Sequence, residues 1–180
     1  MIILMGLAGS GKSTQGQILA ETTGRVWLSA GQVLRDTPDE ALHELQRRGE
    51  LVPDAVTIGL MAEAIAAAKA VGKDVVLDGY PRTLKQAEWI AEHIADEIEA
   101  VVRIVVPRQE LIHRMELRGR ADDLSHEAIE ERFRIVDESN TAICKLLSSH
   151  GVKIRAIDGV GTIEEVQARV KQFITEVEGE

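Results

Sequence analysis

The sequence contains little cysteine, no histidine cluster and more acidic than basic residues. Its single cysteine, Cys144, excludes an intrachain disulfide and a cysteine-rich zinc site. The five histidines show no ligand spacing, so we expect no structural zinc. The chain carries 21 Lys and Arg against 30 Asp and Glu, a net charge of -9. Because nucleic-acid binding needs a basic surface, nucleic acid is not an expected partner.

Long apolar runs are also missing. No run approaches the roughly 18 residues of a membrane span, and the first residues form an apolar stretch rather than a basic leader with a cleavage site. We therefore expect a soluble, cytoplasmic protein without a membrane partner. Nothing indicates an extended apolar interface, which favours a monomer.

What is present predicts an α/β fold. Short apolar runs typical of buried parallel strands alternate with helix-patterned stretches. These runs are 2–5, 26–28, 75–77, 101–106 and 152–157. With no internal repeat or linker, residues 1–180 are expected to form one domain around a doubly wound, five-stranded parallel sheet. Ligands should gather where the strands end, at a rim that includes Gly6, Ser29, Asp78 and Pro107.

Helical patterns fill the stretches between these runs. We expect helices over 14–22, 63–71, 84–98 and 126–149, the last behind a possible cap at Ser125. The longest of them has an apolar stripe that should face the core. The stripe consists of Ile129, Phe133, Val136, Asn140, Ile143 and Leu147.

The segment Gly6–Ser13 fits the P-loop pattern G-x-x-x-x-G-K-[ST] at every fixed position. Glycines let backbone N–H groups point inward, and the N-terminus of the following helix adds a positive dipole end, so phosphate oxygens are held. Lys12 is expected to reach the β- and γ-phosphates of a nucleoside triphosphate, and Ser13 to bind Mg²⁺. The chain thus predicts a triphosphate site.

Arginines cluster strongly in one part of the chain. Of 14 arginines, seven lie between Arg103 and Arg134, a window without lysine. Guanidinium groups bind phosphate oxygens in bidentate fashion, which suits a site of phosphoryl transfer. Within this window, Arg103, Arg108 and Arg134 are better explained as surface ion pairs.

Asp78 ends an apolar run, where P-loop enzymes place the acidic group that orients Mg²⁺ or its water shell. The string Asp78-Gly79-Tyr80-Pro81-Arg82-Thr83, followed by Gln86, resembles the nucleoside monophosphate kinase family and, within it, the adenylate kinase branch. The resemblance covers essentially the whole chain. Further similar segments are 11–15, 28–35, 49–54 and 114–123, together with Arg132.

The resemblance implies a reaction of two nucleotides, ATP + NMP ⇌ ADP + NDP. It makes Arg35 and Arg82 ligands of the acceptor α-phosphate, and it places Arg114 on the ATP base. Residues expected around the transferred group are Lys12, Arg82, Arg118, Arg120 and Arg132. Expected ATP-binding residues are Gly9, Ser10, Gly11, Lys12, Ser13, Thr14, Arg114 and Gly161. Expected acceptor-binding residues are Ala30, Arg35, Leu51, Val52, Gly79, Arg82 and Gln86. Mg²⁺ is expected at Ser13 and, through bound water, at Asp78.

Two insertions are expected to cover the substrates. Residues 30–73 resemble the helical insertion that binds the monophosphate, and residues 114–124 resemble a lid. Almost nothing is inserted between Gly119 and Asp122, so this lid is minimal. Closure must exclude water from ATP, and we hypothesise that residues 114–123 move as a short flap.

The acceptor base is the most open part of the prediction. The Gln86 carboxamide has a donor and an acceptor that match an adenine edge, which favours AMP. Ala30, however, stands where adenylate kinases usually carry Thr, and Ser29-Ala30-Gly31 looks more like the UMP/CMP kinases, which typically have Asn near Gln86. A UMP/CMP kinase is therefore the first alternative, and a non-catalytic P-loop nucleotide-binding module is another.

Two further classes fit less well. A GTPase-like switch needs a guanine-reading N-K-x-D motif, but the only asparagine, Asn140, is followed by Thr141 and Ala142. A sugar or shikimate kinase of the same fold is disfavoured by Gln86 and the 78–83 string.

Overall fold

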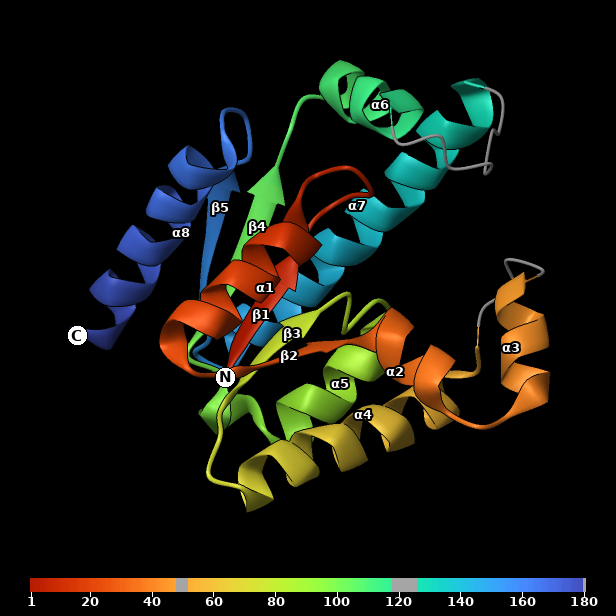
Figure 1. Ribbon diagram of the computed structural model, residues 1–180, viewed down its shortest axis with the longest axis vertical. Helices are drawn as coiled ribbons and strands as arrows, with labels where there is room; N and C mark the ends of the chain where they lie inside the picture. The colour runs from red at the N-terminus through yellow and green to blue at the C-terminus, as the bar shows by residue number, and fades with distance from the viewer. Residues whose placement is uncertain (48–51, 118–125, 180) are drawn as a thin grey trace.

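The computed structural model describes residues 1–47, 52–117 and 126–179. Its centre is a parallel sheet of five strands in the order β2-β3-β1-β4-β5 (Figure 1). The strands are β1 (Ile2–Met5), β2 (Val26–Ser29), β3 (Val75–Asp78), β4 (Ala100–Val105) and β5 (Lys153–Asp158). The doubly wound five-stranded sheet predicted from the apolar runs is thus confirmed, with strand ends shifted by at most one residue.

Helices surround the sheet. In chain order they are α1 (Lys12–Thr23), α2 (Ala30–Asp36), α3 (Glu40–Arg47), α4 (Asp54–Ala70), α5 (Leu84–His93), the short 3₁₀ helix η1 (Ala95–Glu97), α6 (Arg108–Leu117), α7 (His126–Ser149) and α8 (Ile163–Glu178). The helix expected over 63–71 begins nine residues earlier, at Asp54. The helix expected over 84–98 ends at His93, because Ile94 has a non-helical backbone (φ -142°, ψ 16°) and the chain then forms η1.

Side chains of the central strands alternate between two cores. Ile2 and Leu4 pack with α1, α6 and α8, whereas Ile3 and Met5 pack with α4, α5 and α7. This alternation follows from the two-residue period of a strand, and apolar residues at every position need helices on both faces. The stripe predicted on α7 does face the cores: Phe133, Asn140, Ile143 and Leu147 are buried, and Ile129 and Val136 pack partly buried against them.

Gly16 allows α1 to lie close against the sheet. A Cβ at this position would lie 2.8 Å from Leu4 Cδ1 and 3.0 Å from Trp27 Nε1, closer than such atoms normally approach. The helix that begins at the P-loop is therefore held directly over β1, and its N-terminus is fixed at the end of that strand.

Ion pairs hold the amino ends of the strands together, at the end of the sheet opposite the rim. Arg25 donates to Glu99 Oε2 at 2.6 Å and to Asp74 Oδ2 at 3.4 Å, and the amino group of Met1 donates to both carboxylates. Burial alone would raise the pKa of Asp74, but its hydrogen bonds with Glu99 and the amino group lower that pKa to about 2. These contacts join the starts of β1, β2, β3 and β4 at the edge away from the rim.

The predicted insertions differ in how much the structure describes. Within 30–73, α2 follows the end of β2, α4 packs along one face of the sheet, and α3 stands farthest from the sheet (Figure 1). The predicted lid 114–124 lies mostly outside the described residues. Within the described ranges, none of the helices is long and apolar enough to cross a membrane.

Candidate active site

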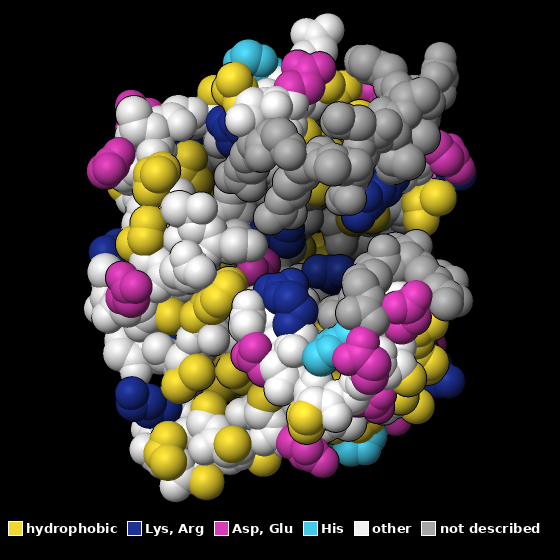
Figure 2. Space-filling view, turned by 45° about the vertical axis from the view of Figure 1, so that its right-hand side comes forward, with side chains coloured by type: hydrophobic (Ala, Val, Ile, Leu, Met, Phe, Trp, Pro, Cys, Tyr) yellow, Lys and Arg dark blue, Asp and Glu magenta, His cyan; other side chains and the backbone are white. Residues whose placement is uncertain are grey.

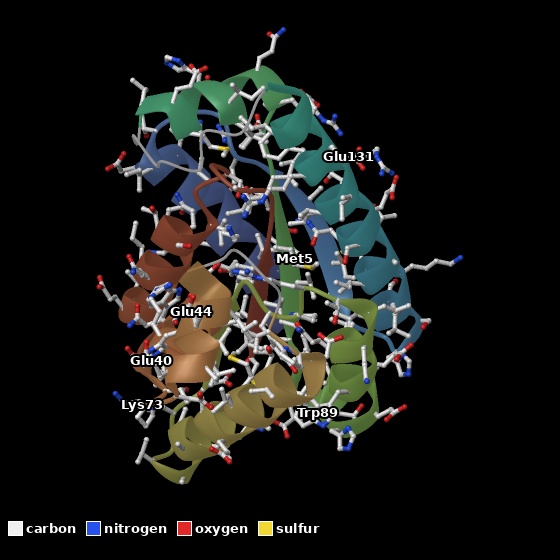
Figure 3. The ribbon with its side chains drawn as sticks, turned by 90° about the vertical axis from the view of Figure 1, so that its right-hand side faces the viewer. Met5, Glu40, Glu44, Lys73, Trp89 and Glu131 are labelled. Carbon is white, nitrogen blue, oxygen red and sulfur yellow. The ribbon has the colours of Figure 1, made fainter. Side chains whose placement is uncertain are left out.

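The carboxyl ends of the strands meet at one rim. Ser29 pairs with Asp78 across β2 and β3, and Leu4 pairs with Asp78 across β1 and β3, so these strands end at the same level. Met5, the last residue of β1, lies near the middle of the molecule in Figure 3, with α6 and the start of α7 above it and α4 and α5 below. The rim therefore lies between two groups of helices.

The P-loop leaves β1 at this rim. Gly6 passes so close to β4 that a Cβ would lie 2.8 Å from the carbonyl oxygen of Ile104. Gly11 caps α1 in the left-handed conformation (φ 88°), which favours glycine, and Lys12 and Ser13 then form the first turn of the helix. Ser10 is buried, and its hydroxyl has no hydrogen-bond partner in the described protein. The loop thus leads directly into a helix N-terminus suited to phosphate.

A pocket of about 360 Å³ opens between this loop, α6 and the start of α8. Arg114 on α6 lies on its wall, where Nε donates to Glu110 Oε1 at 2.7 Å and Nη2 donates to the carbonyl oxygen of Gly159 at 3.2 Å. Six residues predicted to bind ATP line it: Gly9, Ser10, Gly11, Thr14, Arg114 and Gly161. The structure therefore brings together residues from three distant parts of the chain, and we call this space the donor pocket.

A second pocket, of about 300 Å³, lies between α2, the start of α4 and the loop after β3. Of the residues predicted for the acceptor, Ala30, Val52, Gly79, Arg82 and Gln86 line it. We call this space the acceptor pocket. Both pockets lie at the small end of the range for small-molecule sites.

Gln86 is held firmly in the wall of the acceptor pocket. It is only 4% exposed; its Oε1 accepts from the backbone N–H of Arg82 at 2.8 Å, and its Nε2 donates to Asp54 Oδ1 at 2.8 Å. Thr83, the N-cap of α5, accepts from the backbone N–H of Gln86 and donates to the same Asp54 oxygen at 2.9 Å. Asp54 thereby joins the start of α4 to the start of α5.

Arginines converge where the acceptor pocket meets the rim. The Arg82 Nε donates to the carbonyl oxygen of Gly79 at 2.8 Å, which directs the guanidinium along the loop. Desolvation lowers the pKa of Arg82, the positive charges of Arg132 and Arg35 lower it further, and the carboxylate of Asp78 opposes them. Figure 2 shows Lys and Arg side chains gathered in the hollow near the middle of one face. Such a cluster of cationic side chains is suited to an anion.

Asp78 is buried at the end of β3, and its Oδ1 has no hydrogen-bond partner in the described protein. A buried carboxylate oxygen without a partner costs free energy unless a ligand completes it. Oxygen donors from Asp78 and Ser13 suit Mg²⁺, which usually keeps several waters and takes one or two protein ligands. Among the described residues, no group of three or more His, Cys, Asp or Glu side chains could hold a metal ion alone.

Some predicted residues take no described part in either pocket. Leu51, Arg118 and Arg120 lie outside the described residues. Arg35 and Arg132 are exposed and line neither pocket, although both act electrostatically on Arg82. The arginines predicted to form surface ion pairs do so: Arg103 with Asp137, Arg108 with Glu130 and Arg134 with Glu131 and Glu138.

The sequence analysis missed several residues of the two pockets. Gln15, Glu110 and Thr162 line the donor pocket, and Asp54 and Thr57 line the acceptor pocket. Thr162 could have been found, because Thr162-x-x-Glu165 is a capping box, a pattern typical of a helix N-terminus. The helix that it begins, α8, was not predicted. Gln15 and Asp54 lie in segments 11–15 and 49–54, which resemble the family, but neither was predicted as a site residue; Glu110 and Thr57 have no comparable signal in the sequence.

Known proteins of one family are similar to this chain over most of its length. A family model described as "Adenylate kinase" matches residues 4–178. A protein named adenylate kinase from Thermus thermophilus is 35% identical over 94% of the chain and 94% of that protein. Another, from Micrococcus luteus, is 36% identical over 98% of the chain and 91% of that protein. One from Mycobacterium sp. (strain MCS) is 34% identical over 96% of the chain and 98% of that protein. The chain therefore belongs to the adenylate kinase family.

Proposed function

We propose that the protein catalyses the reversible, Mg²⁺-dependent transfer of a phosphoryl group from ATP to AMP, which yields two ADP. The supporting observation is the pair of pockets at the rim, where the carboxyl ends of the strands meet. The donor pocket is bounded by the P-loop and Arg114, and the acceptor pocket by Gln86 and Arg82. A hydrolase or a switch needs only the first of these, whereas a transfer between two nucleotides needs both.

Each group at the rim has a role in this proposal. Lys12 binds the β- and γ-phosphate oxygens of ATP at the helix N-terminus, and Arg82 with Arg35 binds the α-phosphate of AMP. Arg132, with Arg118 and Arg120, surrounds the transferred group. In the loose transition state negative charge spreads over the equatorial oxygens, so positioned cations lower the barrier and no nucleophilic side chain is required.

Ser13 and Asp78 would hold Mg²⁺, Asp78 through a bound water. The ion supplies charge neutralisation on the β- and γ-phosphate oxygens. The carboxylate of Asp78 also raises the pKa of Arg82 and so favours the charged form of its guanidinium.

The test is the formation of ADP from Mg-ATP with AMP, CMP, UMP, GMP, dTMP or shikimate as the acceptor, and the reverse formation of ATP from ADP. We expect AMP to give the highest kcat/KM. Faster turnover with CMP or UMP would refute the acceptor assignment, and ATP hydrolysis without transfer to any acceptor would refute the kinase assignment.

A further inference from the structure

The carboxamide of Gln86 has one orientation that its neighbours permit. A backbone N–H can only donate, and a carboxylate can only accept. Since Arg82 N lies 2.8 Å from one end of the amide and Asp54 Oδ1 lies 2.8 Å from the other, the first end must be the oxygen and the second the nitrogen. A flipped amide would place donor against donor and acceptor against a negatively charged acceptor.

This orientation fixes what the acceptor pocket can read. The amide group has two N–H donors and its oxygen has two lone pairs, and the two contacts above use one of each. What is left for a ligand is one acceptor at Oε1 and one donor at Nε2, on a residue that lines the acceptor pocket.

We propose that Asp54 is a positioning residue that locks the Gln86 amide, so that the pocket selects bases with an exocyclic amino group beside a ring-nitrogen acceptor over bases with a keto oxygen there. This inference rests on the proposed function. Adenine has the matching edge, with N6–H₂ next to N1. Hypoxanthine, its 6-keto analogue, has O6 next to N1–H and would face Gln86 with acceptor against acceptor and donor against donor. Cytosine, with N4–H₂ next to N3, has the same pattern as adenine.

The local structure supports a role for Asp54 beyond that of a helix-terminal acid. One oxygen of this side chain accepts from both Thr83 Oγ1 and Gln86 Nε2, whereas a residue that only stabilised the start of α4 would need neither contact. The carboxylate is also close enough to Tyr80 to raise the pKa of that buried phenol, after the larger effect of burial. Asp54 is thus held against the wall of the pocket from α5 as well as from α4.

The test uses Asp54→Asn, which keeps the shape of the side chain but lets it donate as well as accept. AMP, IMP and CMP affinities are measured by calorimetry, and kcat and KM by ADP formation. The matched control is Glu63→Gln, the same chemical change at an exposed residue of the same helix. Asp54→Ala serves as a second variant, because it removes the acceptor altogether.

In the wild type we expect AMP to bind more tightly than IMP. In Asp54→Ala the ratio of AMP to IMP affinity should fall by up to about tenfold, the scale of one directional base contact, because the Arg82 N–H then holds the amide at one end only. Asp54→Asn should keep most of the ratio, because its side-chain oxygen can still accept from Gln86 and Thr83. The ratio of AMP to CMP should stay the same, because both bases have the amino pattern. Glu63→Gln should change neither ratio.

An unchanged AMP-to-IMP ratio in Asp54→Ala would overturn the proposal, and so would an equal loss of affinity for all three ligands, which indicates a purely structural role. Failure of the proposed function would look different. The wild type would then form no ADP from AMP, while the affinity ratios would still report on the lock.

Discussion

Asp78→Asn should separate stability from activity. In the wild type the Asp78 carboxylate is 2% exposed, and its Oδ1 has no partner in the described protein. A buried polar group left unsatisfied costs about 1–3 kcal/mol, and the attraction to Arg82 recovers part of that cost. Replacement by the neutral, isosteric amide removes the charge, so we expect the free energy of unfolding without nucleotide to rise by about 1 kcal/mol.

For a chain of this size, 1 kcal/mol corresponds to a rise in Tm of about 2–4 °C. Activity should move in the opposite direction. If Asp78 orients the water shell of Mg²⁺, its loss should lower kcat by about 10²–10³-fold, the usual cost of removing one group that stabilises transition-state charge.

The assay combines thermal unfolding by circular dichroism, without nucleotide, with ADP formation under saturating Mg-ATP and AMP. A suitable control is Asp158→Asn, because Asp158 also ends a parallel strand but is exposed and accepts from the backbone N–H of Val160 at 3.0 Å. An Asp78→Asn protein with a lower Tm and nearly unchanged kcat would refute the reasoning, since it would make Asp78 a structural acid.

Three other perturbations follow from the same structure. Lys12→Ala should lower kcat by about 10²–10³-fold in the ADP assay while the far-ultraviolet circular dichroism stays unchanged; retained turnover would remove the P-loop from the mechanism. Gly16→Ala should lower the free energy of unfolding by about 1–3 kcal/mol, because the added methyl group overpacks against the sheet, and it should alter Trp27 fluorescence. The control Gly59→Ala, in open space on α4, should raise the free energy of unfolding by about 0.5–1 kcal/mol. Equal effects of the two variants in urea unfolding would contradict the packing argument. Asp74→Asn should lower the free energy of unfolding at pH 7 by about 1 kcal/mol, after allowance for the partial exposure of Asp74. Because the folded-state pKa is lowered to about 2, this cost should disappear as pH falls from about 4 to 2, and a constant difference would argue against the ion pairs.

Much of the fold could be predicted because it is encoded locally. A strand buried on both faces needs an apolar side chain at every position, so runs such as 75–77 are visible in the sequence without knowledge of their neighbours. The end of α5 at His93 could not be predicted, since the apolar pattern continues through Ile98, and it is the backbone at Ile94 that ends the helix. The start of α4 was missed because Asp54 and its neighbours lack the alanine-rich pattern that identifies the rest of that helix.

The candidate site shows the same limit at longer range. The P-loop is contiguous, so Lys12 and Ser13 could be predicted as phosphate and Mg²⁺ ligands from the motif alone. Gln86 could be predicted as a base-binding residue because its carboxamide matches an adenine edge. The atoms that orient this carboxamide could not be predicted. Asp54 lies 32 residues away, and its contact with Gln86 exists only because α4 and α5 begin side by side. Contacts of this kind depend on how helices pack, and a local sequence pattern does not predict them.

The acceptor pocket joins base recognition to phosphate binding through one residue. The backbone N–H of Arg82 holds the amide of Gln86, while its guanidinium, directed by the carbonyl oxygen of Gly79, lies with the cationic cluster at the rim. A shift of the loop that moved the guanidinium would therefore also release one end of the amide. The donor pocket depends on other elements, namely α1, α6 and α8. The acceptor pocket is lined from α2, α4, α5 and the loop after β3, so among the described residues no helix lines both pockets.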